Sequence, residues 1–432
     1  MADILPFRAL RYHPQHVSHA VTQPYDKISP AMQDRYYAAS PYNLVRIILG
    51  RRESDDNTEH NVYTRAASYF RDWRRQEVLR QDSAPSLYAY SQRFAAPGTN
   101  AQSERLGFIA VGRLEDYSAQ VVYRHEQTLA KPKADRLDLL RATRAHFGQL
   151  FMLYEDSGEI DSLVSGGAHS TATTEVTDEY GVVHRVWQIA DAALIDSVRS
   201  KMRNKKLIIA DGHHRYETAL NYRNECRAAG SANSSKDALH EFVMMTFVNM
   251  NSPGLLVLPT HRVVRGLASF SADDFETSSR NFFQVEEIDS ALDAPRAAAI
   301  LREKGSGGPA LLAVTANRAF LLHKPKAGGQ PLAGLSDRQQ ALDVVQLHKR
   351  LLEGVLKLSE ESIRNQQNIS YVRDAADALA QVRSGNANVA FLMNPCRVQQ
   401  VRDIAFAGEV MPQKSTDFYP KLLSGLTIYA LD

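Results

Sequence analysis

The stretch that decides the fold of this chain is KKLIIADGHHRYETAL, residues 205–220. Its first half contains a short apolar run, Leu207 to Ala210, with the length and composition of a strand. Asp211-Gly212 is a turn signal, and the residues after it fit a helix with one apolar face made of Tyr216, Ala219 and Leu220. The pattern therefore predicts a strand, a tight turn and a helix in direct succession.

Such a unit has the chemistry of an anion site. The first N–H groups of a helix and the positive end of its dipole meet at the turn. Gly212 has no Cβ, so a phosphate could approach the backbone closely. Arg215 offers a two-pronged grip on phosphate, and His213 and His214 add donors whose charge changes near neutral pH. We therefore expect these residues to bind phosphate, with Asp211 and His214 as candidate catalytic groups.

Two other interpretations of this stretch stay open. Asp211-Gly212 could be a plain turn in which Asp211 is the N-cap of the helix, with both histidines serving the structure. The two histidines could instead bind a metal, although adjacent His side chains seldom chelate one ion and would need ligands from elsewhere.

The rest of the chain mixes strand-like and helix-like segments. Apolar runs of strand length occur at 105–114, 148–155, 206–210, 241–248, 310–316 and 388–394. Helical spacing occurs at 136–147, 189–203, 339–356 and 374–385, the last ending in a glycine suited to a C-cap. Segment 93–104 is polar and rich in turn residues, and Ser271 with Asp274 resembles a capping box. We expect an α/β (α+β) fold with a mixed sheet, divided into regions 1–250 and 251–432.

Composition narrows the classes of function. The 432 residues are 44% hydrophobic and 23% charged, enough apolar material for a core. The net charge of +2, from 51 basic and 49 acidic residues, gives no reason to expect a nucleic-acid partner. Two cysteines, Cys226 and Cys396, cannot supply a disulfide framework or a cysteine-based zinc site. No run approaches the ~18 apolar residues of a membrane helix, and the start lacks a signal-peptide pattern, so a cytoplasmic protein without membrane contact is expected.

The DGHHR motif after a strand and before a helix resembles the phosphate-binding motif of the ParB/sulfiredoxin superfamily. That superfamily includes CTP-binding partition proteins, ATP-using sulfiredoxins and free-serine kinases. More closely, the chain resembles the domain of unknown function 1015 family nearly end to end. The segments that carry this resemblance include 6–12, 21–29, 40–50, 124–143, 210–220, 251–264 and 411–422. It implies a ParB/sulfiredoxin-like core in region 1–250, with an additional C-terminal α/β region.

The charged segment RHEQTLAKPKADR, 124–136, supplies further candidates. The free-serine kinases imply a glutamate that acts as general base on a substrate hydroxyl, and Glu126 is the candidate here. Lys131 and Lys133 could balance charge on a transferring phosphoryl group. The alternative is a solvated charged loop.

Three more segments contain candidate substrate contacts. PYDKIS, 24–29, and PYNLVRIIL, 41–49, contribute Asp26, Asn43 and Arg46, although residues of this kind often cap turns. MPQKSTDFYPK, 411–421, contributes Lys414, Ser415 and Thr416, which could contact phosphate or carboxylate or could fasten the C-terminus.

Motifs that are missing exclude other chemistry. The sequence has no G-x-G-x-x-G, no Walker loop, no G-x-S-x-G and no H-E-x-x-H. His214 stands where a sulfiredoxin would need its reactive cysteine, so peroxiredoxin repair is not expected. The preferred hypothesis is a kinase that uses ATP or ADP with Mg²⁺ to phosphorylate a small hydroxyl substrate such as free serine. A nucleotide-switched partition-type DNA-binding protein and a metal-dependent hydrolase or lyase are the alternatives, and the sequence leaves the oligomeric state open.

Overall fold

The computed structural model describes residues 2–99, 101–126, 131–169, 171–230, 235, 237–326 and 332–432, without the side chains of 131–133. The chain forms two compact units. The first unit contains Met1–Arg124, Thr128–Leu256 and Pro420–Asp432, and the second contains His125–Gln127 and Val257–Tyr419. The sequence predicts one boundary between two regions, at residues 250 and 251. In the structure the chain passes from one unit to the other at 124/125, 127/128, 256/257 and 419/420.

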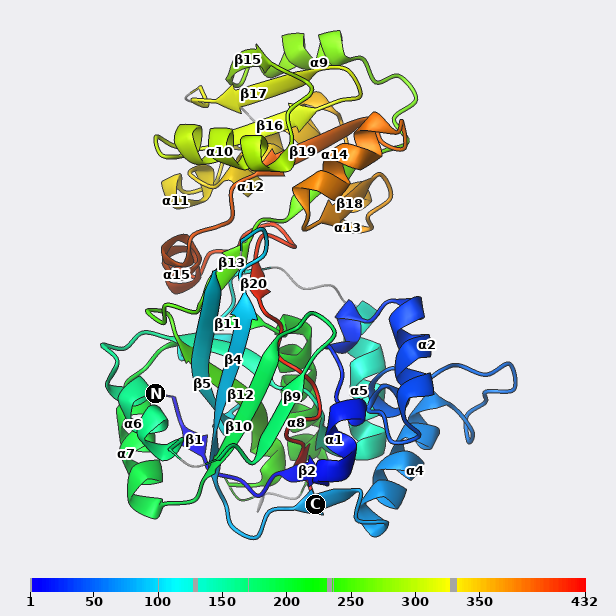
Figure 1. Ribbon diagram of the computed structural model, residues 1–432, viewed down its shortest axis with the longest axis vertical. Coiled ribbons are helices and arrows are strands. Elements are labelled where there is room, and N and C mark those ends of the chain that lie inside the picture. Colours follow the sequence, from blue (N-terminus) through cyan, green and yellow to red (C-terminus); the bar gives the residue numbers. More distant parts are fainter. Residues whose placement is uncertain are drawn as a thin grey trace. The chain divides into compact units, whose positions relative to one another are not determined.

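The first unit is built on a nine-stranded mixed sheet with the order β6-β11-β8-β12-β5-β4-β10-β9, to which β1 adds by pairing with β5 (Figure 1). Two neighbouring pairs, β11 with β6 and β12 with β8, are parallel, and the other pairs are antiparallel. The strands are β1 (Ile4–Leu5), β4 (Leu87–Ala95), β5 (Gln102–Arg113), β6 (Val122–Tyr123), β8 (Leu150–Tyr154), β9 (Thr174–Thr177), β10 (Val183–Ile189), β11 (Leu207–Asp211) and β12 (Phe242–Asn249). The expected mixed α/β fold is therefore confirmed.

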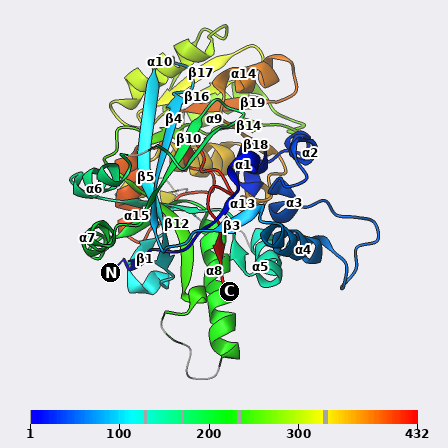
Figure 2. The same cartoon turned by 60° about the horizontal axis from the view of Figure 1, so that its bottom comes forward.

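Eight α-helices accompany this sheet in the part of the first unit that is described. Helices α6 and α7 pack on each other and beside β5 and β1 (Figure 1), while α4, α5 and α8 form a row of neighbours (Figure 2). The helices are α1 (Pro14–Ala20), α2 (Pro30–Ala39), α3 (Val45–Ile48), α4 (Val62–Arg75), α5 (Lys131–Thr143), α6 (Glu159–Gly167), α7 (Ala192–Met202) and α8 (His213–Ala229). Two short ladders, β2 (Leu10–Tyr12) with β3 (Leu79–Gln81) and β7 (Ala145–His146) with β21 (Tyr429–Ala430), complete the unit.

The core of the first unit explains why α8 lies where it does. Tyr216 and Ala219 are 0% and 2% exposed and join the same apolar cluster as Ile209 of β11 and Met152 of β8. The apolar face predicted for residues 216–220 is therefore the face that α8 buries. Burying a side chain as large as Tyr216 contributes roughly 1.5–3 kcal/mol, more than helix propensity supplies at one residue.

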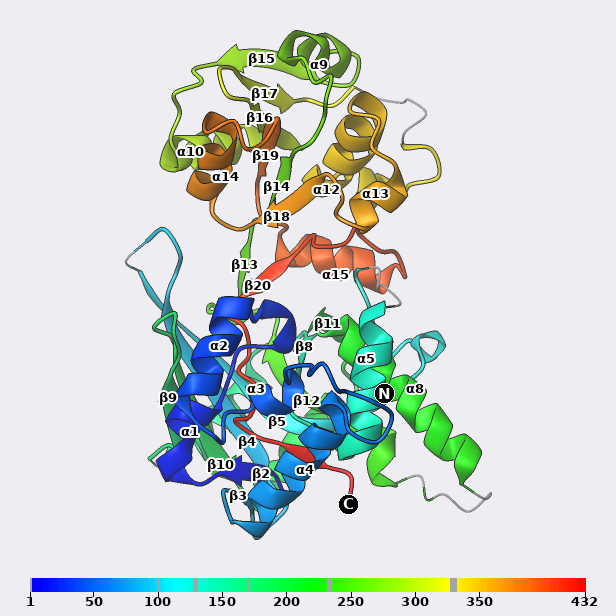
Figure 3. The ribbon, with the colours of Figure 1, turned by 90° about the vertical axis from the view of Figure 1, so that its right-hand side faces the viewer.

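The second unit contains a six-stranded sheet with the order β15-β17-β16-β19-β14-β18, antiparallel throughout. Its strands are β14 (His261–Val264), β15 (Gln284–Ile288), β16 (Ala310–Val314), β17 (Ala319–His323), β18 (Ile369–Val372) and β19 (Val389–Met393), and β13 (Leu256–Leu258) pairs with β20 (Asp417–Tyr419). Figure 3 shows helices on both faces of this sheet. Helices α10 (Ala294–Gly305) and α14 (Ala375–Arg383) share one apolar cluster with β16 and β19.

The predicted helix 339–356 is wrong as a single element. The chain forms α11 (Asp337–Gln340), α12 (Asp343–Gln346) and a π-helix, η5 (Leu347–Val355). The break lies at Leu342, which is extended and 1% exposed. Next to it, Asp343 turns inward to accept a hydrogen bond from Ala310 N at 3.3 Å. Tertiary contacts with β16 therefore override a continuous helical pattern.

The other predicted elements agree with the structure within a few residues. All six predicted strands form, and segment 93–104 is the hairpin between β4 and β5. Ser271 caps α9 (Ala272–Ser279) by accepting from Asp274 N at 3.2 Å. Gly385 follows α14 with φ +75°, the left-handed conformation that favours glycine there. The remaining helices are α13 (Glu360–Arg364) and α15 (Val398–Phe406).

Membrane insertion of a helix has no support in the described part of the chain, where no helix combines the length and the apolarity that a span requires.

Gly107 in β5 provides a test of the central sheet. A Cβ built at Gly107 would lie 2.4 Å from the backbone oxygen of Phe247 in β12, whereas one at Gly307 would meet nothing within 4 Å. We expect Gly107→Ala to lower the free energy of unfolding by about 1–3 kcal/mol, because backbone atoms must shift. Urea unfolding would measure this loss, with Gly307→Ala as the matched control, and equal stability of the two variants would contradict the packing described here.

Candidate functional site

The predicted strand–turn–helix is present at residues 207–229. β11 ends at Asp211, Gly212 is the N-cap of α8 with φ +98°, and no side chain caps the helix. The alternative in which Asp211 is the N-cap is therefore wrong, because Asp211 belongs to the strand. A helix start without a side-chain cap presents N–H groups and a positive dipole end to an anion.

Glycine at position 212 makes room for Arg215. A Cβ there would lie 2.9 Å from Leu150 Cδ2 and 3.0 Å from Arg215 Nη2, and the positive φ would strain any other residue. Gly148 borders the same guanidinium, since a Cβ there would lie 3.3 Å from Arg215 Nη1. Both glycines therefore hold space for the arginine head group, whereas the sequence predicts that Gly212 makes room for a phosphate.

Asp211 connects the turn to a distant part of the chain. Arg215 Nη2 donates to Asp211 Oδ2 at 2.8 Å and Arg215 Nη1 donates to Gln149 O at 2.6 Å. Lys421 Nζ lies 3.4 Å from Asp211 Oδ1. Two cations thus face one carboxylate beside the positive end of α8.

A cavity of about 80 Å³ opens beside Arg215 in the first unit. Its lining includes Arg215, Gly148, Tyr25 and Arg136. The Arg136 guanidinium lies 4.2 Å from the centre of the Tyr25 ring, and Arg136 Nη1 donates to Ile48 O at 2.6 Å. Burial raises the pKa of Tyr25, so its phenol stays protonated and available as a hydrogen-bond donor at neutral pH.

A buried polar network fixes the segment that brings Lys421 to Asp211. Gln92 Nε2 donates to Lys421 O at 2.8 Å, and Arg105 Nη2 donates to Pro420 O at 2.5 Å. Arg105 also donates to Gln92 Oε1, and both side chains are 1% exposed. Burial lowers the pKa of Arg105 to about 10, so it remains charged at neutral pH. These bonds position the backbone on either side of Lys421.

The predicted substrate residues of the N-terminal segments go to different places. Asp26 is exposed and lies in the 3-10 turn η1 (Tyr25–Lys27), next to the Tyr25 that lines the cavity. Asn43 is 1% exposed and is used inside the fold, donating to His19 O at 2.7 Å and accepting from Val45 N at 2.9 Å. Arg46 lines a separate, larger cavity.

The structure brings two predicted segments of the second unit together. Glu126 Oε1 accepts from Lys414 N at 2.8 Å, and His125 Nε2 and Thr416 Oγ1 lie 2.9 Å apart. Ser415 Oγ donates to Pro412 O at 2.5 Å. Segments 125–126 and 411–416, far apart in sequence, thus form one local structure in which Glu126 has a defined position.

A fully buried arginine supports this pairing. Arg262 is 0% exposed and donates from Nη2 to Lys414 O at 3.0 Å and to Gln413 O at 3.4 Å. Burial lowers the pKa of Arg262, while the nearby Glu126 carboxylate acts in the opposite direction. Cys396 belongs to the same surroundings, where burial raises the pKa of its thiol to about 12 and makes it a poor nucleophile at neutral pH.

The remaining predictions concern two lysines of segment 124–136 and the alternative of a metal site. Lys131 and Lys133 lie in the first turn of α5, but their side chains fall outside the described residues. Among the side chains that the structure does describe, no group of three or more His, Cys, Asp and Glu could hold a metal ion.

Sequence reasoning did not place Tyr25 and Arg136 beside Arg215, and it predicted a phosphate or carboxylate contact for the segment of Lys421 without connecting that segment to Asp211. The proline-bounded segment 411–421 and the X-Pro-Tyr pattern at 24–25 were signals. Neither pattern shows which side chains meet Arg215, because that depends on the return of the C-terminal segment to the first unit.

His261 in β14 allows a test of the buried polar surroundings. Burial and the adjacent Arg262 lower its pKa to about 4. The unfolded chain takes up this proton near pH 6.5, so the folded state loses stability as pH falls from about 6.5 to 4, by up to roughly 3 kcal/mol. We expect His261→Gln to flatten that part of a urea-unfolding pH profile, whereas exposed His60→Gln leaves it unchanged. An unchanged slope in His261→Gln would contradict a buried neutral imidazole.

Comparisons with known proteins give a family and weak structural likenesses. A conserved hypothetical protein from Pyrococcus furiosus is 13% identical with a TM-score of 0.36, covering 71% of this chain and 91% of that one. A free serine kinase variant in complex with AMP is 12% identical with a TM-score of 0.36, covering 71% and 89%. SbnI with a C-terminal truncation, from Staphylococcus aureus, is 9% identical with a TM-score of 0.34, covering 74% and 87%.

The comparison with curated proteins gave no match. The sequence profile of the family described as "Protein of unknown function (DUF1015)" matches residues 4–345, which is most of the chain. The resemblance expected from the sequence segments is therefore confirmed, and the chain belongs to the DUF1015 family.

Proposed function

We propose that this protein is a nucleotide-dependent small-molecule phosphotransferase whose nucleotide phosphates bind at the turn between β11 and α8. The observation that carries the proposal is the charge arrangement at that turn. Arg215 and Lys421 both contact the carboxylate of Asp211, at 2.8 Å and 3.4 Å, beside a helix start without a side-chain cap. The DGHHR resemblance supports the same conclusion.

In the proposed complex, Arg215 exchanges its present hydrogen-bond acceptors for phosphate oxygens. Arg215 now gives one guanidinium N–H to Asp211 and another to the carbonyl of Gln149. A phosphate can replace these acceptors with a doubly charged, bidentate partner, which suits guanidinium geometry better than a carbonyl does. His213 and His214 begin α8 and are proposed to add donors to the phosphate, as the sequence predicts.

The transfer step is proposed as an in-line displacement. The hydroxyl oxygen of a substrate such as free serine forms a bond to the terminal phosphorus, and the bridging P–O bond to the leaving nucleotide breaks. Glu126 is proposed to take the hydroxyl proton as the leaving oxygen gains charge. The donor is proposed to be ATP or ADP in the cytoplasm. Lys131 and Lys133 are proposed as charge-balancing cations, and Asp26, Lys414, Ser415 and Thr416 as substrate contacts.

Mg²⁺ is proposed to enter with the nucleotide. The described residues contain no ligand cluster that would hold a metal alone. Mg²⁺ is commonly bound through one or two carboxylates together with substrate phosphates, and Asp211 is the carboxylate at the proposed phosphate site.

Binding of nucleotide tests the first half of the proposal. We expect ATP, ADP or inorganic phosphate to raise the melting temperature of the full chain. In Arg215→Met the Kd of the bound ligand should increase about 10- to 100-fold, because a hydrogen bond to a charged group contributes about 1.5–3 kcal/mol. Lys421→Met should weaken binding in the same direction. Exposed Arg203→Met is the control for loss of one positive charge. Equal affinities in wild type and Arg215→Met would refute a phosphate site at this turn.

Glu126→Gln tests the second half. Glutamine keeps an oxygen that can accept from Lys414 N but cannot take a proton at neutral pH. We expect phosphoryl transfer from ATP or ADP to L-serine, followed by ³¹P NMR, to fall at least 100-fold, within the range that general acid–base catalysis contributes. Nucleotide Kd should stay within about twofold of wild type. Exposed Glu361→Gln is the control, and full activity of Glu126→Gln would remove the residue from the mechanism.

A further inference from the structure

A second cavity in the first unit is larger than the one beside Arg215. A cavity of about 470 Å³ lies among α2, α3, α4 and the loop between α3 and α4. Half of its ten lining residues are charged, namely Asp34, Arg46, Arg51, Glu53 and Arg65. A volume of this order suits a small organic molecule.

The charged side chains of this cavity differ in how closely they pair with an opposite charge. Arg51 Nη2 pairs with Asp34 at 2.5 Å, and Arg65 Nη1 pairs with Asp56 at 2.5 Å. Glu53 is held only loosely, with Oε1 lying 3.6 Å from Arg65 Nε. Its side chain is 56% exposed. The closely paired groups leave Glu53 as the carboxylate with spare capacity.

Arg46, in contrast, contacts carbonyl oxygens and an aromatic ring. It donates to the carbonyl oxygens of Tyr37 and Ser40, at 2.9 Å and 3.5 Å, and its guanidinium lies 4.4 Å from the centre of the Tyr37 ring. Within the described residues, no carboxylate forms an ion pair with Arg46. The cavity therefore combines one guanidinium without a counter-ion and one loosely paired carboxylate.

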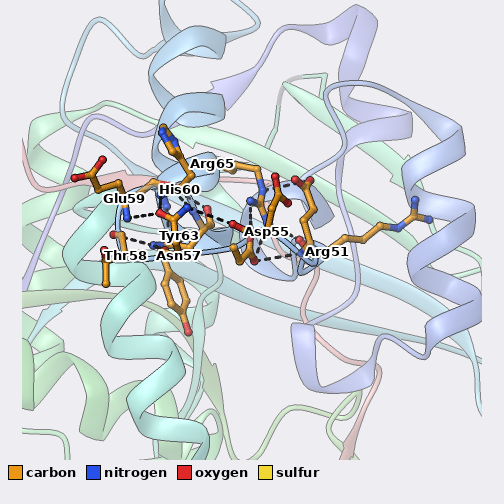
Figure 4. A network of polar contacts seen from close by, with 12 residues as sticks. Arg51, Asp55, Asn57, Thr58, Glu59, His60, Tyr63 and Arg65 are labelled. Atoms are coloured by element: carbon orange, nitrogen blue, oxygen red, sulfur yellow. Dashed lines mark hydrogen bonds and ion pairs between the residues drawn. The ribbon is translucent and has the colours of Figure 1, made fainter.

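The walls that carry these two groups are braced. Tyr37 is contacted by both Arg46 and Arg51, whose guanidiniums lie 4.4 Å and 4.2 Å from the ring centre, and its hydroxyl accepts from Arg51 N at 2.9 Å. Figure 4 shows the loop that continues from Arg51, where side chains and backbone are linked as far as Arg65. Within it, Asn57 N donates to His60 O at 2.7 Å, and Asn61 forms a capping box at the start of α4. A braced wall lowers the entropic cost of ordering a ligand.

We propose that this cavity binds a small zwitterion, an amino acid whose carboxylate meets Arg46 and whose ammonium group meets Glu53. Asp34 and Asp56 are closely paired with Arg51 and Arg65, so Arg46 and Glu53 are the two charged groups with capacity for a ligand. A ligand with only one charge would satisfy one of the two remaining groups and leave the other unmatched. A zwitterion satisfies both, and an Arg–carboxylate pair adds bidentate geometry.

The site is distinct from the proposed phosphate site and does not depend on it. Arg46 and Arg215 line different cavities of the same unit. Loss of phosphate binding in Arg215→Met should therefore leave zwitterion binding intact.

A calorimetric titration of the full chain tests the proposal. The probes are glycine, 4-aminobutanoate and 6-aminohexanoate, which differ in the separation of their charges, with acetate and propylamine as singly charged controls. We expect at least one amino acid to bind at least tenfold more tightly than either control. Failure of all three amino acids to bind, or equal binding of acetate or propylamine, would overturn the proposal.

Variants locate the binding. Arg46→Met and Glu53→Gln should each raise the Kd of the bound amino acid at least tenfold, while Arg52→Met should not, since Arg52 is 68% exposed and does not line the cavity. Ala38→Phe fills the hollow without removing a charge and should also abolish binding, which keeps the test decisive if Arg46→Met unfolds. Unchanged affinity in Ala38→Phe would place the amino acid elsewhere and refute this site.

Discussion

The carboxylate of Asp211 holds the first unit's candidate site together. It stands at the last position of β11, accepts from Arg215 in the first turn of α8, and faces Lys421 from the C-terminal segment. One side chain thus ties a strand, a helix and a returning tail to the same point. Both cationic side chains therefore contact the same carboxylate, and the positive end of the α8 dipole lies at the same turn.

Buried arginines repeat this tying function elsewhere. Arg105 donates to Pro420 O in the first unit, and Arg262 donates to Lys414 O in the second. Each is almost completely buried and each holds part of the C-terminal stretch by its carbonyl oxygens. Arginine suits this role because its several donors can satisfy successive backbone acceptors, and a buried charge without such partners would be costly. Buried arginine side chains therefore hold the C-terminal stretch at the backbone carbonyls of Lys414 and Pro420.

Three other reactive side chains, Cys396, His261 and Glu126, have different surroundings. Cys396 is buried with a raised pKa, which fits a chemistry that does not depend on thiols. His261 is buried and its pKa is lowered to about 4, so its imidazole is neutral at neutral pH and serves the packing of β14. Glu126, in contrast, is held by the backbone of Lys414 in a region of polar side chains. This contact fixes the Glu126 carboxylate beside segment 411–416.

The sequence by itself determined most of the local elements, including the strand–turn–helix around Asp211, and the family. Apolar periodicity and turn residues are local properties, so the strands at 207–211 and 242–249 and the buried face of α8 could be predicted from neighbours in the chain. Only the tertiary structure decided which distant residues join them. Lys421 meets Asp211 because the chain returns to the first unit at residue 420, and the helix expected at 339–356 breaks because Asp343 turns toward β16. Such contacts depend on long-range packing and burial, whose free energy exceeds that of local propensity.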